Sequence, residues 1–367
     1  MPMERAQVNT KAKSSKKKIT AIVASIIAVL LIAVDWMASA IVYDENFNQR
    51  FESYEPLKRS VDDFDGLRRT RYQFSSDKGQ KLTGYLYSSG EDQHGIIVMA
   101  HGFGGGGHNS YMDFANYFAH HGYHVFAYDA TGNDESEGDG VGGLPQGVAD
   151  LDYAISFVRD SGHFPNLPMV LFGHSWGAYS VSNVLTYHPE VKAVIACSGF
   201  NASSDLFASE GKKQAGNAIY AMMPFVRLHE WNRFGKYASN TALNGFSKSN
   251  AAVMIVHSFD DEIVPSEYGY ETYLKHYKDD PRFTFVSFED QGHDDYLQGA
   301  YADAFNSEFD QWHASLDYDP NDPANKERFA KDKAAYIHTN LDRKQWSNSL
   351  NDDLFKHFVD FYDSHTA

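Results

Sequence analysis

One serine in the chain has the surroundings expected of a nucleophile. The stretch Leu171-Phe172-Gly173-His174-Ser175-Trp176-Gly177 contains Gly-x-Ser-x-Gly. Residues 169–172 before it form an apolar run typical of a buried strand, and residues 176–188 after it carry apolar residues at helical spacing. A sharp turn between the two would present the hydroxyl, and its glycines would permit the strained backbone. Because a serine hydroxyl is a weak nucleophile alone, the chemistry requires a histidine, an acid and oxyanion donors elsewhere.

Two later segments supply a base and an acid. Val256-His257-Ser258-Phe259-Asp260-Asp261 continues an apolar run, and Gln291-Gly292-His293 follows the next one. In this order His293 would take the serine proton and return it to the leaving group. A buried carboxylate, from Asp260 or Asp261, would hold the imidazole in the correct tautomer.

These residues give the chain a resemblance to a known family. It resembles α/β hydrolases of the serine aminopeptidase, monoacylglycerol lipase and lysophospholipase-like branch, over about residues 67–293 and the last helix. The shared motifs, in family order, are His101-Gly102, the glycine-rich stretch 129–138, Gly-x-Ser-x-Gly, His257 to Pro265, and Gly292-His293. Asp134 and Ser258 stand where the family has glycine.

The resemblance assigns roles to individual residues. It implies Ser175 as nucleophile, His293 as base and Asp261 as acid, with Asp260 as the fallback. It also implies that the backbone N–H groups of Phe103 and Trp176 form the oxyanion hole. No cofactor and no metal site are implied.

The pattern of apolar runs predicts the α/β-hydrolase fold, a mostly parallel sheet flanked by helices. Strands are expected at 67–74, 81–87, 95–100, 124–128, 169–172, 191–196, 252–257 and 283–288, most of them alternating with helices. Residues 201–250 break this rhythm and are expected to form a helical lid. Within it, Met222, Met223 and Phe225 are candidates either for the lid core or for contacts with an acyl chain. Residues 294–367 are expected to be helical, with a loop at 318–324.

The N-terminal segment predicts a membrane-spanning helix. Residues 1–18 hold six Lys and Arg against one Glu, and residues 19–42 are apolar except for Thr20, Ser25, Asp35 and Ser39. We expect a basic cytoplasmic tail at 1–18, a signal anchor at 19–42, a linker at 43–66 and the hydrolase domain at 67–367, outside the cytoplasm. Trp36 and Tyr43 would lie at the far interface. The alternative is a secreted protein, released by cleavage at Ala40 within Ala38-Ser39-Ala40.

Composition narrows the choice of partners. The net charge is −17 with a basic first segment, so the body is strongly acidic, which argues against nucleic acid as a partner. The single cysteine, Cys197, excludes an intramolecular disulfide. The sequence does not indicate an oligomeric state.

The sequence therefore predicts a membrane-anchored serine hydrolase that cleaves a carboxylic ester with an apolar acyl part. An alternative is a peptidase of the aminopeptidase kind, with Glu210 or Glu230 of the lid holding the substrate amine. A third hypothesis, disfavoured by the complete set of catalytic residue types, is a non-catalytic surface binding protein on the same scaffold.

Overall fold

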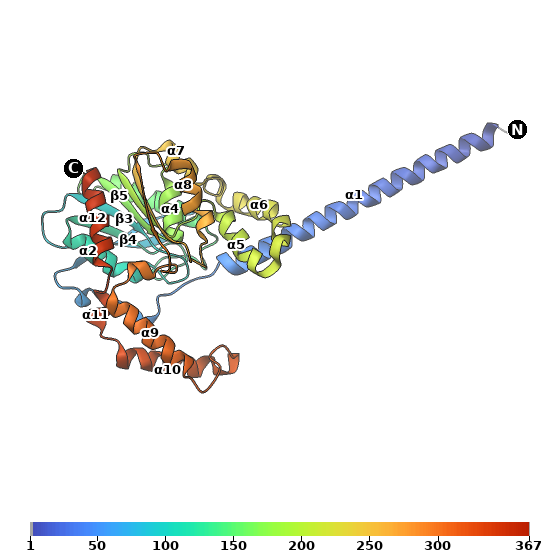
Figure 1. The fold of residues 1–367 in the computed structure, drawn as a ribbon. Helices are drawn as coiled ribbons and strands as arrows, with labels where there is room; N and C mark the ends of the chain where they lie inside the picture. Colours follow the sequence, from blue (N-terminus) through green and yellow to red (C-terminus); the bar gives the residue numbers. More distant parts are fainter. Residues whose placement is uncertain (1–2, 367) are drawn as a thin grey trace.

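The centre of the molecule is an eight-stranded sheet. The computed structural model describes the backbone of residues 3–366 and the side chains of residues 20, 22–27, 29–30 and 32–366. The strand order is β1-β2-β4-β3-β5-β6-β7-β8; the pairs β1–β2 and β2–β4 are antiparallel and all other pairs are parallel (Figure 1). The strands are β1 Arg68–Ser75, β2 Lys81–Ser88, β3 Gly95–Ala100, β4 Tyr123–Tyr128, β5 Met169–His174, β6 Ala193–Cys197, β7 Ala252–Ser258 and β8 Phe283–Phe288.

The central strands are buried on both faces, which explains their unbroken apolar sequence. Every residue of β3, β6 and β7 is buried. Side chains alternate between two cores because successive residues of a strand point to opposite faces. In β3, for example, Ile96 and Val98 belong to one core, and Ile97 and Met99 to the other.

Helices cover both faces of the sheet. One core includes residues of α3 Gln146–Asp160, α4 Trp176–Val184 and α8 Tyr270–Tyr277, and the other includes residues of α2 Met112–His120 and α12 Asp352–Thr366. The expected helix after Ser175 ends at Val184 rather than at residue 188. Pro189 follows closely, and proline disfavours helical backbone in the residue before it.

Residues 201–250, called the insertion below, contain no strand. They form α5 Ser203–Ala215, η4 Gly216–Ala221, α6 Met223–Phe234, η5 Gly235–Tyr237 and α7 Ala242–Lys248. The helices α5 and α6 lie at the side of the body where the N-terminal helix leaves it (Figure 1). That the insertion acts as a lid stays a prediction.

A helical hairpin near the C-terminus projects from the body. It consists of α9 Ala300–Ala314 and α10 Lys326–Asn340, which α11 Arg343–Ser347 connects towards α12 (Figure 1). The two long helices pack through aromatic rings, such as Trp312 against Tyr336 at 4.6 Å between centroids.

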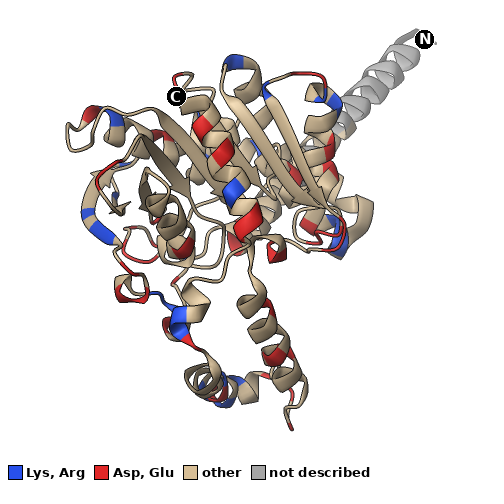
Figure 2. Cartoon of the chain, turned by 60° about the vertical axis from the view of Figure 1, so that its left-hand side comes forward, with Lys and Arg blue, Asp and Glu red and all other residues tan. Residues whose placement is uncertain are grey.

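Charged residues are dispersed over the body. Asp and Glu outnumber Lys and Arg by 49 to 32, and the acidic residues are scattered over several elements rather than gathered into one patch (Figure 2). No broad basic face of the kind that follows a nucleic acid backbone is visible in this view.

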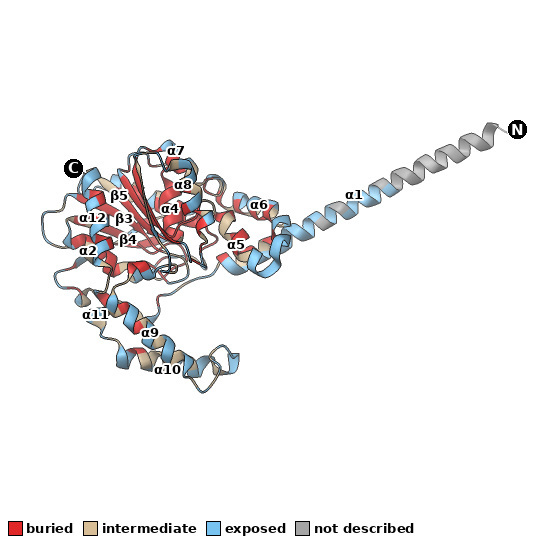
Figure 3. Cartoon of the chain, in the orientation of Figure 1, coloured by how far each residue is buried: buried red, intermediate tan, exposed pale blue. Residues whose placement is uncertain are grey.

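The N-terminal helix α1 runs without interruption over Met3–Phe47 and extends far beyond the body (Figure 3). Residues 22–47 are long and apolar enough to cross a membrane, and most of this segment is exposed. The side chains of the predicted basic tail, residues 1–18, lie outside the described residues. Tyr43, expected at the far membrane interface, is fully buried against the insertion, so its side chain contacts protein. Of residues 43–66, expected to be a linker, 43–47 belong to α1 and 48–66 lie along the body, where Phe64 is buried and Phe51 bridges to Asn133.

Candidate active site

Ser175 occupies a strained turn between β5 and α4. Its φ is 56°, in the left-handed region that non-glycine residues seldom adopt, and its N–H donates to the Cys197 carbonyl at 2.8 Å. A Cβ on Gly173 would lie 2.3 Å from the Gly177 oxygen, and a Cβ on Gly177 would lie 2.0 Å from the Ala100 oxygen. Both glycines are therefore required by close backbone approach, as expected for a serine held at the tip of a strand-to-helix turn.

His293 and Asp261 form a hydrogen-bonded pair. The Nδ1 atom of His293 is 2.7 Å from Oδ2 of Asp261, whose side chain is completely buried. The other carboxylate oxygen of Asp261 accepts the N–H groups of Ile263 and Val264 at 2.9 and 2.8 Å. The carboxylate is thereby fixed on one side by backbone and directed at the imidazole on the other.

Asp260 has a different position. Its side chain is exposed, and its Oδ1 accepts hydrogen bonds from the Ser258 hydroxyl and from the N–H groups of Gln291 and Gly292. Asp260 therefore braces the loop that carries His293 but does not pair with the imidazole. Ser258 takes part in the same brace.

A second histidine supports the first. His174 is buried, and this burial, together with the nearby His293, lowers the pKa of His174 to about 3, so that its ring is neutral. Its Nδ1 accepts the Tyr111 hydroxyl at 2.9 Å, and its Nε2 faces the His293 carbonyl oxygen at 3.3 Å. The same Tyr111 oxygen accepts the Gly102 N–H at 3.0 Å. Tyr111 thus connects the glycine loop to His174 and, through it, to His293. No pattern in the sequence indicated this role.

The glycine loop after β3, residues 102–107, is held in place by contacts with Asp129, Asp134 and His101. His101 accepts the Ala130 N–H through Nε2 at 3.0 Å. Asp134 stands at φ 36°, and its carboxylate accepts the N–H groups of Ser53 and Gly107 at 2.6 and 2.8 Å. A Cβ on Gly107 would lie 1.8 Å from Oδ1 of Asp129. These contacts place the loop beside the serine turn, with the Phe103 ring edge-on to Trp176 at 5.6 Å.

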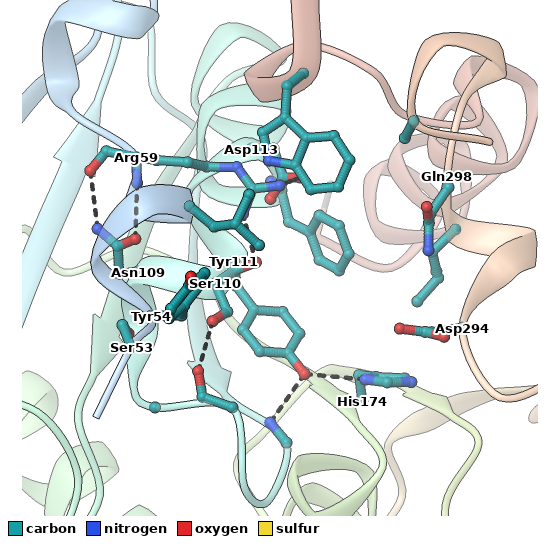
Figure 4. Close-up of a pocket in the computed structure, with 18 of the residues that line it drawn as sticks. Ser53, Tyr54, Arg59, Asn109, Ser110, Tyr111, Asp113, His174, Asp294 and Gln298 are labelled. Carbon is teal, nitrogen blue, oxygen red and sulfur yellow. Dashed lines mark hydrogen bonds and ion pairs between the residues drawn. The ribbon is translucent and has the colours of Figure 1, made fainter. Parts of the chain in front are cut away.

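Ser175 and His293 line one cavity of about 420 Å³. Figure 4 shows polar side chains around it, among them Arg59, Asn109, Asp113 and Asp294. Its walls come from residues 53–59, from residues 102–114, and from residues 293–302 and 346–350. Segments expected to be a linker and a C-terminal helical region therefore shape this space.

The insertion does not contribute to this cavity. Met222, Met223 and Phe225, the candidate substrate contacts, are not among its lining residues. Met223 is buried in a core cluster, and Met222 packs against that cluster. Glu230 accepts hydrogen bonds from Tyr43 and Ser203 instead of facing the cavity.

At the far end of the cavity the Arg59 guanidinium pairs with Asp113 at 2.6 Å and lies against the Trp346 ring. Burial raises the pKa of Asp113, and Arg59 counteracts that rise. Among the described residues, no group of three His, Cys, Asp or Glu side chains is arranged to hold a metal ion.

The sheet order and the helices on both of its faces are those of the α/β-hydrolase fold. Residues 91–253 match the model of the serine aminopeptidase S33 family, within the branch that the motifs indicated. This match supports the α/β-hydrolase fold over that part of the chain. No curated protein sequence is similar enough to match this chain.

Solved structures support the same fold. An esterase from Pyrococcus furiosus, in space group C2221, is similar with 16% identity over 72% of this chain and 95% of that chain, at a TM-score of 0.53. Its P212121 crystal form is similar over 72% and 97% of the two chains with 16% identity and a TM-score of 0.51.

Proposed function

We propose that this protein is a serine hydrolase that cleaves carboxylic esters by acyl transfer. One observation carries the proposal: Ser175 on its strained turn and His293, which is hydrogen-bonded to Asp261, line the same cavity. A nucleophile, a base and an orienting acid are the parts that acyl transfer requires.

In this proposal His293 takes the proton of Ser175 as the hydroxyl attacks the ester carbonyl. Asp261 holds Nδ1 protonated, so that Nε2 is free to act as the base, and it stabilises the imidazolium that forms. The backbone N–H groups of Phe103 and Trp176 would receive the oxyanion. His293 then gives the proton to the leaving alcohol, and water releases the acyl group by the same steps.

The cavity limits the substrate. A volume of about 420 Å³ lies in the range of sites for small organic molecules rather than for long polymers. Its lining combines apolar side chains, such as Phe114 and Leu297, with charged ones. An ester with a compact acyl group and a polar part elsewhere suits this lining, which differs from the insertion that suggested the apolar acyl part.

A peptidase is the second candidate, and the position of Asp294 favours it. An aminopeptidase needs an acidic group near the scissile bond to hold the substrate ammonium. Glu210 and Glu230 do not line the cavity, and Glu210 pairs with Lys213. Asp294 does line it, next to His293 in the sequence, and its carboxylate faces the cavity (Figure 4).

We further propose that α1 anchors the protein in a membrane, with the basic N-terminus in the cytoplasm and the hydrolase body outside. The apolar segment 22–47 and the lysines before it support this orientation. Cleavage at Ala40 would instead release the body; intact mass and resistance to alkaline extraction of the mature protein distinguish the two.

The function is tested with a panel of substrates and the Ser175→Ala variant. We expect hydrolysis of short p-nitrophenyl esters that exceeds hydrolysis of aminoacyl anilides and that Ser175→Ala abolishes. Preferred cleavage of the anilides, weakened by Asp294→Asn, would instead support the peptidase. Absence of turnover on all substrates would support the non-catalytic binding protein.

A further inference from the structure

The outer face of α6 carries large apolar side chains that the body does not cover. Leu228 and Trp231, three residues apart, are 45% and 58% exposed. They lie outside the buried face of the same helix, which includes Val226, Glu230 and Phe234. Two exposed residues of this size on one face of a helix indicate a contact surface rather than isolated surface residues.

The position of this face is fixed relative to α1. The Tyr43 hydroxyl donates to Glu230 at 2.6 Å, and Asp44 pairs with Arg233 at 2.9 Å and faces His229 at 3.2 Å. The helix α6 is therefore attached to α1 at residues 43 and 44.

This attachment determines how far α6 lies from a membrane that α1 crosses. Tyr43 and Phe47 are buried in protein, so the lipid-exposed part of the apolar segment ends at Val42. At 1.5 Å per residue, the 16 residues 19–34 before Asp35 span about 24 Å, short of the ~30 Å hydrocarbon core of a bilayer, so the segment that crosses the core extends past Asp35 towards Val42. If the hydrocarbon core of the bilayer ended at Asp35, apolar side chains such as Met37 and Ile41 would lie in water. These two side chains are 55% and 58% exposed. Tyr43 must therefore lie close to the membrane surface, and α6 with it.

The charge of the region fits the same position. Residues 203–237 carry more basic than acidic residues, in contrast to the acidic body. The basic residues are Lys212, Lys213, Arg227, Arg233 and Lys236, and the acidic ones are Asp205, Glu210 and the buried Glu230. A helix with tryptophan and leucine on its outer face and basic residues beside them is typical of the interface with phospholipid headgroups.

We propose that Leu228 and Trp231 of α6 rest in the headgroup region of the membrane that α1 crosses. The insertion would then hold the body against the lipid surface, so that α1 and α6 together fix the orientation of the hydrolase body. This inference rests on the membrane anchorage proposed above and not on the identity of the substrate.

A local depth measurement on the full chain tests the proposal. Trp231→Cys is labelled with bimane and reconstituted in vesicles of phosphatidylcholine and phosphatidylglycerol, with or without a nitroxide on the lipid headgroup. The native Cys197 is fully buried, and burial raises the pKa of its thiol, so it does not compete for the label. Ala330→Cys, exposed on α10 far from α1, is the matched control (Figure 1).

We expect the nitroxide lipids to cause a several-fold loss of emission at position 231 and no loss at position 330. Equal emission at the two positions, in vesicles that retain the protein through alkaline extraction, would overturn the proposal. Crosslinking of two copies through residue 231 without quenching by lipid would also overturn it, because a second chain would then cover this face.

Two further observations distinguish failure of this inference from failure of the proposed anchorage and from misfolding of the variant. If the protein is extracted from the vesicles at alkaline pH, the proposed anchorage is wrong, and this inference fails with it. If Trp231→Cys does not fold, brominated lipids are applied to the native protein and to Trp231→Phe. A quenched component that is lost in the variant supports the proposal, and identical quenching contradicts it.

Discussion

Replacing Asp261 by asparagine tests how the structure orients His293. Oδ1 of Asp261 accepts two backbone N–H groups, and Oδ2 faces Nδ1 of His293 at 2.7 Å. An asparagine would keep its oxygen on the two N–H donors and would therefore direct its NH₂ group at Nδ1. Nδ1 would then have to accept, the ring proton would move to Nε2, and the base that Ser175 requires would be lost.

The size of this effect follows from the tautomer. An aspartate-to-asparagine change that fixes the wrong tautomer lowers kcat by about 10⁴ in a serine protease triad, which corresponds to about 5 kcal/mol of activation free energy. Asp260→Asn is the matched control. Its oxygen can still accept from Ser258, Gln291 and Gly292, so we expect less than about a tenfold loss.

The assay is kcat/KM for p-nitrophenyl acetate over pH 5 to 9 (roughly the stable range of such proteins), with circular dichroism to verify folding. A loss at Asp260 that equals or exceeds the loss at Asp261 would refute this account of the acid. A folded Asp261→Asn variant with nearly full activity would refute the role of the His293–Asp261 pair altogether.

Three further changes follow from individual contacts. Burial raises the pKa of Glu230 from 4.5 to about 7, so the folded protein binds a proton that the unfolded chain releases. About 3 kcal/mol of folding stability is therefore lost as the pH rises from about 4.5 to about 7. Glu230→Gln should flatten the pH dependence of the free energy of unfolding measured in urea, and an unchanged pH dependence would contradict this. Gly177→Ala should lower the melting temperature and abolish ester hydrolysis, because its Cβ would meet the Ala100 oxygen; normal activity would refute the required close approach. Tyr111→Phe removes the hydroxyl between Gly102 and His174 and should lower kcat on the order of tenfold; an unchanged kcat in steady-state kinetics would show that this bridge is dispensable.

Much of the fold was predictable because local pattern and burial agree. The strands of the sheet are either unbroken apolar runs or bounded by turns, so β3 and β8 have the predicted bounds and the others differ by at most a few residues. The turn that carries Ser175 could be recognised in the sequence because Gly173 and Gly177 are required where neighbouring backbone approaches closely. The position of Asp261 against His293 is compatible with the motif-based choice, although its catalytic role stays a prediction.

The walls of the site could not be predicted, because they depend on distant segments packing together. Residues 53–59 lack a periodic pattern, yet Arg59 reaches Asp113 across the chain. Trp346 lies in a short helix whose approach to the cavity is fixed by Arg343, which donates to the carbonyls of Lys58 and Pro56. Such contacts leave no repeat or spacing in the sequence. The same holds for Tyr43, where an aromatic residue after an apolar run fits a membrane interface and a protein core equally well.

The central claim is that Ser175 is an activated nucleophile, and covalent labelling tests it most directly. The protein is treated with a fluorophosphonate probe and the modified residue is located by peptide mass spectrometry. The account predicts one adduct, on Ser175, that is absent in Ser175→Ala and strongly slowed in the Asp261→Asn variant. Labelling that persists in Ser175→Ala, or a folded wild-type protein that forms no adduct, would contradict it.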